Sequence, residues 1–243
     1  MPSASSHTPA AFWIAVDADN EAAAIEVVRA GAVPLTLKRT IPSLLQRGLS
    51  QTPASVALEK NWIGLLEALL DAGWSPDARC TPKALPLLGE AVFRANAQAV
   101  SLLVARGASL DVVAGRGASS ETLWGLLVRA SWGATATPEA VRAIADVLCA
   151  ASVPLSAPAA VGAARNPAFL AVFDRAPRAD ASALPFLSVF MDPRYGWDWS
   201  HPRLLKNANP CLVEMVVSLR ASMDLETCLP DATRRPRVRS PRV

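Results

Sequence analysis

The 243-residue sequence has only two histidines, His7 and His201, and its four cysteines form no Cys-x-x-Cys pair. These shortages exclude zinc-finger spacing and leave few groups for acid–base or nucleophilic catalysis. Aspartate and glutamate are scattered singly, without the spacing of a metal-binding loop. Gly115 and Gly117 precede no Walker lysine and follow no predicted strand, so we expect a connecting loop there and no phosphate site. The sequence therefore predicts a protein that is not an enzyme, with no cofactor, no metal and no small-molecule substrate.

The sequence also lacks a long apolar run, although 51% of its residues are hydrophobic and only 19% are charged. Val147–Ala164 is an uncharged stretch of 18 residues, but it contains two prolines and most of its apolar residues are alanine, so it predicts no membrane span. Residues 1–16 are uncharged as well, yet no basic segment precedes an apolar core, and we expect no Sec signal peptide. A composition this apolar excludes a disordered chain. We expect a cytoplasmic protein with free thiols, and the 20 arginines against four lysines are typical of a GC-rich bacterial genome.

Most of the chain has no excess of basic residues. The formal net charge is +3, but residues 233–243 hold five arginines and no acid. The remaining 19 basic and 21 acidic residues leave residues 1–232 with a net charge of −2. Pro236 and Pro241 interrupt the arginines, so the tail predicts a disordered segment with at most weak contact to phosphate groups. A slightly acidic body argues against a nucleic-acid function.

Short apolar segments recur along the chain, and each one ends in a small residue and a turn. The clearest copies end at Gly31, Gly73, Gly107 and Ala151, with weaker copies at Phe169–Asp180 and Val213–Leu225. Apolar residues spaced by three and four predict a helix with one buried face, and a glycine after the last turn favours its termination. Another short apolar segment comes before most copies: Pro53–Asn61, Leu85–Ala95, Thr122–Ser131, Ala157–Arg165 and Pro202–Asn207. Such helix pairs bury their faces only by stacking, and no stretch alternates like a strand, so the pattern predicts an all-α solenoid.

Two of these copies resemble ankyrin repeats. Leu102–Ala108 and Leu69–Gly73 are similar to the family's second helix, and Ser75–Arg79 resembles its finger loop. Thr52-Pro53 and Ala57 stand at the spacing of the family's Thr-Pro-Leu-His-x-Ala motif, with Ala54-Ser55 in place of Leu-His. The same small position is held in other copies by Ala15, Ala91 and Ala160. The resemblance covers most of residues 10–225 and is close only between about 50 and 112. It implies a concave face of finger loops and first helices that binds a protein partner.

Aromatic residues supply further candidates. Trp62 and Trp124 fall within apolar helical patterns and predict core positions, whereas Trp74 follows a glycine stop and is expected to be partly exposed at a finger base. Tyr195, Trp197 and Trp199 cluster with Arg194 in a predicted insertion. Aromatic residues beside arginine are typical of binding hot spots. The alternative is that this insertion folds back and seals a gap in the solenoid.

These patterns predict a flexible N-terminus at 1–9, a domain of about five or six degenerate ankyrin-like repeats at 10–229, and a basic disordered tail at 230–243. Insertions are expected near 132–137 and 192–202. We expect a non-catalytic scaffold that binds a protein partner and no membrane. The candidate contact residues are Trp74, Asp77, Arg79, Asp111, Arg116, Arg194, Tyr195, Trp197 and Trp199.

Two other functions stay open on the sequence alone. The uncharged start, rich in serine and threonine, is compatible with the leader of a bacterial effector that is translocated into a host cell and engages host proteins. An enzyme would need Cys211 and His201 to form a dyad with an activated thiolate. The alternative places His201 near a helix N-terminus and Cys211 in the core.

Overall fold

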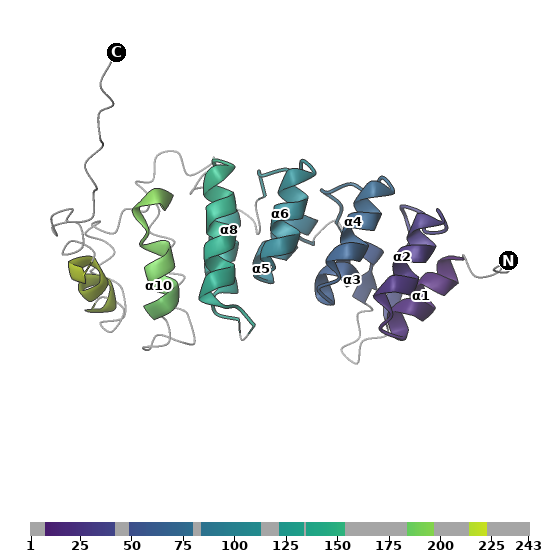
Figure 1. Ribbon diagram of the computed structural model, residues 1–243, viewed down its shortest axis with the longest axis horizontal. Coiled ribbons are helices and arrows are strands. Elements are labelled where there is room, and N and C mark those ends of the chain that lie inside the picture. The colour runs from purple at the N-terminus through teal and green to yellow at the C-terminus, as the bar shows by residue number, and fades with distance from the viewer. Residues whose placement is uncertain are drawn as a thin grey trace, which may run out of the picture.

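The structure is a computed structural model that describes residues 8–41, 49–79, 84–112, 122–133, 135–153, 184–196 and 214–222. The described part is mostly helical, as the sequence predicts (Figure 1). Its helices are α1 Pro9–Asp17, α2 Glu21–Arg29, α3 Pro53–Glu59, α4 Ile63–Asp71, α5 Leu87–Phe93, α6 Ala97–Ala105, α7 Leu123–Ala130, α8 Pro138–Ala150, α10 Leu184–Phe190 and the 3-10 turn η4 Pro193–Tyr195. A further helix covers residues 214–222.

One small β-hairpin interrupts the helices. Strands β1 (Arg39–Ile41) and β2 (Leu49–Gln51) pair antiparallel between α2 and α3, with Arg39 opposite Gln51. The Arg39 Nε donates to Gln51 Oε1 at 3.1 Å. This hairpin is a small exception to the all-α fold that the sequence predicts. Three-residue strands are too short to show the apolar–polar alternation by which a sequence signals a strand.

The helices stack as hairpins in two rows. The first eight helices pair in chain order, α1 with α2, α3 with α4, α5 with α6 and α7 with α8. The second helices α2, α4, α6 and α8 then contact one another in sequence, as do the first helices α3, α5 and α7. Figure 1 shows the resulting row, with α10 packed beyond α8. One hydrophobic core runs through the row from Phe12 to Tyr195.

The same tight turn joins the two helices of the first three hairpins. Its middle residue is left-handed in each: Asp19 (φ +53°), Asn61 (φ +57°) and Ala95 (φ +54°). The next N–H bonds to an alanine carbonyl five residues back: Asn20 to Ala15 (2.9 Å), Trp62 to Ala57 (2.8 Å) and Asn96 to Ala91 (3.0 Å). All three alanines are buried, and they are small positions that the sequence singled out. Ala160, the fourth, lies outside the described residues.

The fourth hairpin turns differently. From α7 to α8 the chain runs through residues 131–137, whereas three residues suffice in the other hairpins. The segment predicted as an insertion, Trp132–Thr137, lies in this turn. The longer turn places extra backbone at one edge of the stack.

The second helix of each hairpin also ends in a common way. Gly31, Gly73 and Gly107 are left-handed, as expected of residues that end a helix. In the fourth hairpin the left-handed residue is Ser152 (φ +55°), and not Ala151 as the spacing suggested. The following N–H bonds to a carbonyl five residues back in each later copy: Trp74 to Leu69, Ala108 to Leu103 and Val153 to Leu148, all at 3.0 Å.

Threonine begins several first and second helices. The hydroxyls of Thr8, Thr52 and Thr137 each accept a hydrogen bond at 3.2 Å from the N–H three residues on, and a proline follows each threonine. At Thr52 the bond is reciprocal, since its N–H donates to Ser55 Oγ at 3.0 Å. Ser55 therefore caps α3 from a position where the ankyrin motif has histidine.

Candidate functional site

The predicted contact residues Asp77, Arg79 and Asp111 are exposed in the connectors that follow α4 and α6. Two of them also hold their loops. Asp77 Oδ1 accepts from the N–H of Ser109 at 2.7 Å, which ties one connector to the next, and Arg79 Nη1 donates to the carbonyl of Ala84 at 2.9 Å. The described parts of these connectors are thus joined across neighbouring units. Arg116 lies outside the described residues.

The expectation that Trp74 is partly exposed is wrong, because only 5% of its surface is accessible. Its N–H bonds back to Leu69, so the residue after the glycine turns its side chain onto the core, as Ala108 and Val153 do in later units. The indole Nε1 is buried and has no hydrogen-bond partner among the described residues. Trp74 is a packing residue and offers no surface to a partner. Trp62 and Trp124 are buried as predicted.

Tyr195 is buried too, with 4% of its surface accessible. Its ring lies 5.6 Å from that of Trp124, and its hydroxyl donates to Asp146 Oδ1 at 2.8 Å. Burial raises the pKa of the Tyr195 hydroxyl, and the bond to Asp146 raises it further. The expectation of a partner-facing Tyr195 is therefore wrong. The described part of the predicted insertion folds back onto α8, which is the alternative that the sequence left open.

Arg194 is exposed, and it forms ion pairs that connect the segment around Tyr195 to α8. Its Nη2 lies 2.7 Å from Asp192 Oδ2 and 3.2 Å from Asp146 Oδ1. The side-chain hydrogen bond from Arg194 lowers the pKa of Asp192, which Arg142 also faces at 3.6 Å. We call Asp146, Asp192, Arg194 and Tyr195 the Tyr195 cluster. Trp197 and Trp199 lie outside the described residues.

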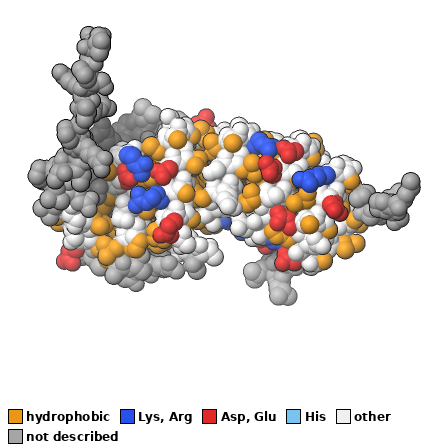
Figure 2. Space-filling model, in the orientation of Figure 1, with side chains coloured by type: hydrophobic (Ala, Val, Ile, Leu, Met, Phe, Trp, Pro, Cys, Tyr) orange, Lys and Arg blue, Asp and Glu red, His pale blue; other side chains and the backbone are white. Residues whose placement is uncertain are grey.

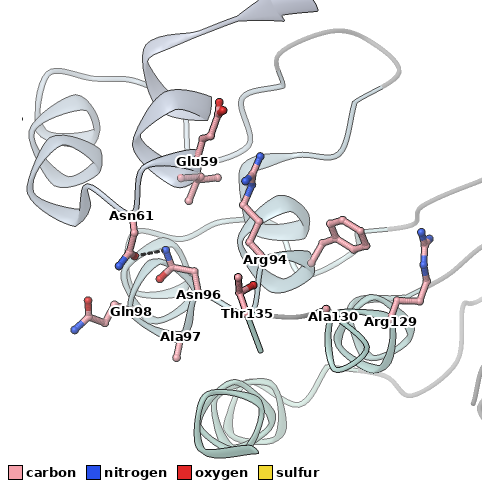
Figure 3. A pocket seen from close by; sticks show the side chains of 12 residues that line it. Glu59, Asn61, Arg94, Asn96, Ala97, Gln98, Arg129, Ala130 and Thr135 are labelled. Atoms are coloured by element: carbon pink, nitrogen blue, oxygen red, sulfur yellow. Dashed lines mark hydrogen bonds between the residues drawn. The ribbon is translucent and has the colours of Figure 1, made fainter. Parts of the chain in front are cut away.

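A groove that the sequence did not predict lies at the edge where first helices turn into second helices. Its volume is about 660 Å³, and its lining includes Glu59, Asn61, Phe93, Asn96, Arg129 and Thr135. These residues come from the ends of α3, α5 and α7 and from the turns after them. Figure 3 shows Asn61, Asn96 and Gln98 on one side and Arg129 on the other, with Arg94 and Thr135 between them. We call this site the turn-edge groove.

Two features shape the turn-edge groove. Phe93 is 42% exposed at the end of α5, and the guanidinium of Arg129 stands 5.2 Å from its ring. Gly133 and Thr135 of the long α7–α8 turn form part of the lining. The sequence contains a signal that could have located this groove. Phe93 is an apolar residue on the last turn of a first helix, and an insertion follows one unit later.

Several charges on the described surface pair across units. Lys60 bonds to Asp19 at 2.6 Å, and Arg106 bonds to Asp71 at 2.6 Å in the preceding unit. Figure 2 shows basic side chains next to acidic ones over the face that it presents. This interspersed pattern offers no strongly basic field to a nucleic acid on that face.

The described residues hold no group of three or more histidine, cysteine, aspartate or glutamate side chains that could bind a metal ion. Cys149 is a free thiol that lies 3.4 Å from the carbonyl oxygen of Arg194. Cys211 and His201, the residues of the dyad hypothesis, lie outside the described residues. Within the described ranges, every helix is too short or too polar to cross a membrane.

The sequence matches no model of a protein family, and a search of characterised proteins finds no significant similarity.

Proposed function

We propose that this chain is an ankyrin-like solenoid that binds a protein partner and catalyses no reaction. The observation that carries the proposal is the recurrence of one backbone design: the left-handed turn at Asp19, Asn61 and Ala95, and the left-handed helix stop at Gly31, Gly73 and Gly107. Both recur at intervals of 42 and 34 residues. Together with the Thr-Pro cap of α3, they support the ankyrin resemblance of residues 50–112.

A stack of this kind suits partner binding because packing and recognition use different residues. Leucines of the second helices, such as Leu65, Leu69 and Leu103, are fully buried between neighbouring units. The connectors and turns instead present side chains to solvent over several units in a row. Recognition residues can then vary without disturbing the core that holds the row together.

Asp77, Arg79 and Asp111 form the connector surface through which we propose that a partner binds. Arg116, Trp197 and Trp199 remain predicted contacts. Opposite charges spaced along the connectors would set the orientation and specificity of a protein partner. A protein partner, a cytoplasmic location and the absence of a cofactor all belong to this proposal.

Affinity capture from a lysate of the source organism tests the proposed function. The full chain should retain a partner, and the double substitution Arg79→Glu with Asp111→Lys should lose it while the circular dichroism stays unchanged. Glu26→Lys with Arg29→Glu is the matched control, because it reverses two exposed charges on α2 and keeps the same net charge. Equal capture by both double variants would refute the connector surface, and no specific capture by the wild type would refute the function.

A further inference from the structure

The turn-edge groove spans three consecutive units, from Glu59 at the end of α3 to Arg129 near the end of α7. Neighbouring helices pack about 8–10 Å apart, so two such steps give a length of roughly 16–20 Å. An extended chain advances about 3.3 Å per residue. The groove therefore has the length of about five or six residues of extended peptide.

Side-chain amides dominate one side of this groove. Asn96 Nδ2 donates to Asn61 Oδ1 at 2.7 Å, and Asn96 Oδ1 accepts from the N–H of Ala99 at 3.0 Å. These two bonds fix the orientation of both amides (Figure 3). Among the described residues, the Nδ2 group of Asn61 and the amide of Gln98 have no hydrogen-bond partner. An asparagine or glutamine amide offers the same donor and acceptor groups as a peptide bond, and so it pairs with an exposed main chain.

Phe93 provides an apolar contact in the same groove. Large hydrophobic side chains that are exposed elsewhere in the described residues, such as Ile14 on α1, do not line it. An aromatic ring beneath an arginine, as Phe93 lies beneath Arg129, has the composition of a binding hot spot. A partner side chain that covered the exposed part of this ring would remove apolar surface from water.

Charge does not dominate the site. Its ionisable lining consists of Glu59, Arg94 and Arg129. Glu59 accepts from Gln51 at 3.0 Å, Arg94 bonds to Glu90 at 3.0 Å, and Arg129 lies over the Phe93 ring. The groove therefore has no concentration of one sign that would recruit a phosphate backbone or an Arg-rich segment such as residues 233–243. Hydrogen bonds to the amides and apolar contact with the Phe93 ring therefore determine which ligand the groove binds.

From these features we infer that the turn-edge groove binds an extended peptide segment of a protein partner. The amides of Asn61, Asn96 and Gln98 pair with the peptide main chain, and an apolar peptide side chain rests on Phe93. This inference rests on the proposed function and adds a second surface, distinct from the connectors, for a linear segment of the partner.

The test uses the full chain and a phage-displayed library of random dodecapeptides. Enriched peptides are synthesised with a fluorophore, and their Kd is measured by fluorescence anisotropy against the wild type and a triple variant with Asn61→Gly, Phe93→Ala and Gln98→Ala. Glycine suits the left-handed backbone at position 61, so the hairpin turn is kept. Ile14→Ala is the matched control, because Ile14 is an exposed hydrophobic residue outside the groove.

We expect the triple variant to raise the Kd by at least about tenfold, as for the loss of a hot-spot residue, and Ile14→Ala to change it less than about twofold. Matching circular dichroism spectra and Tm values establish that the triple variant is folded. Equal Kd values for the triple variant and the wild type would overturn the proposal that the groove binds a peptide. If the same peptides no longer bind the double variant Arg79→Glu with Asp111→Lys, the groove proposal is overturned, but the proposed binding of a protein partner stands. An absence of enriched peptides also overturns the groove, while the capture experiment still decides the proposed function.

Discussion

Replacing Ala95 by glycine should stabilise the protein, which is unusual for an alanine-to-glycine change. Ala95 is the middle residue of the turn between α5 and α6 and has a φ of +54°. A left-handed conformation costs an L-residue about 1–2 kcal/mol, and glycine adopts it freely. The glycine also makes the unfolded chain more flexible, which costs about 0.4–1 kcal/mol. The net gain is about 0.5–1 kcal/mol, or a rise in Tm of about 1–4 °C at this chain length.

Two control substitutions make this prediction specific. Gly107→Ala should destabilise by about 0.5–1 kcal/mol, because Gly107 has a φ of +77° and an added Cβ meets no atom within 4 Å, so the backbone strain is opposed only by the reduced flexibility of the unfolded chain. Ala143→Gly, at an exposed position within α8, should destabilise by about 1 kcal/mol. Urea unfolding followed by circular dichroism measures all three. If Ala95→Gly destabilises as much as Ala143→Gly, residue 95 is not left-handed and the shared hairpin turn is refuted.

Three further predictions concern the buried aromatic residues and the Tyr195 cluster. Trp74→Ala should destabilise by about 3–5 kcal/mol by leaving a cavity. Trp74→Phe should cost clearly less, because it also removes an indole N–H that lacks a partner among the described residues, and equal losses in urea unfolding would contradict this. Tyr195→Phe should cost about 1 kcal/mol through the lost bond to Asp146, and an unchanged free energy of unfolding would mean that the bond contributes nothing. The pKa of Asp192 is lower in the folded protein than in the unfolded chain, so ionised Asp192 stabilises the fold. This stabilisation is fully present above the unfolded pKa of about 3.9 and is lost as the pH falls toward the folded-state pKa. The Tm difference between wild type and Asp192→Asn should therefore shrink between about pH 5 and pH 3, and a difference independent of pH would contradict the argument.

The helix ends were the most predictable part of the fold. Glycine after an apolar run marks a helix stop by local backbone sterics, and Gly31, Gly73 and Gly107 all take that conformation. The buried alanines at 15, 57 and 91 follow from the same local pattern, because a small side chain is required where two helices cross closely. These features depend on a few neighbouring residues, and a single sequence contains them.

The candidate site was less predictable because it depends on contacts between distant residues. The partner of Tyr195 is Asp146, 49 residues earlier, and nothing local indicates that bond. Trp74 occupies the position that the smaller Ala108 and Val153 hold in later units, and its burial depends on how much room the neighbouring units leave. The groove likewise requires Phe93, Arg129 and the long turn near 133 to meet at one edge of the stack.

Site-specific photo-cross-linking tests the central claim, that this stack binds a protein partner on defined surfaces, most directly. A benzophenone amino acid replaces Asp111 on the connector surface, Phe93 in the turn-edge groove, or Glu26 on α2 outside both surfaces. The account predicts that irradiation in cells joins one partner protein to the chain from position 111, or from position 93, and not from position 26. Adducts from position 26 alone, or from none of the three positions, would contradict it.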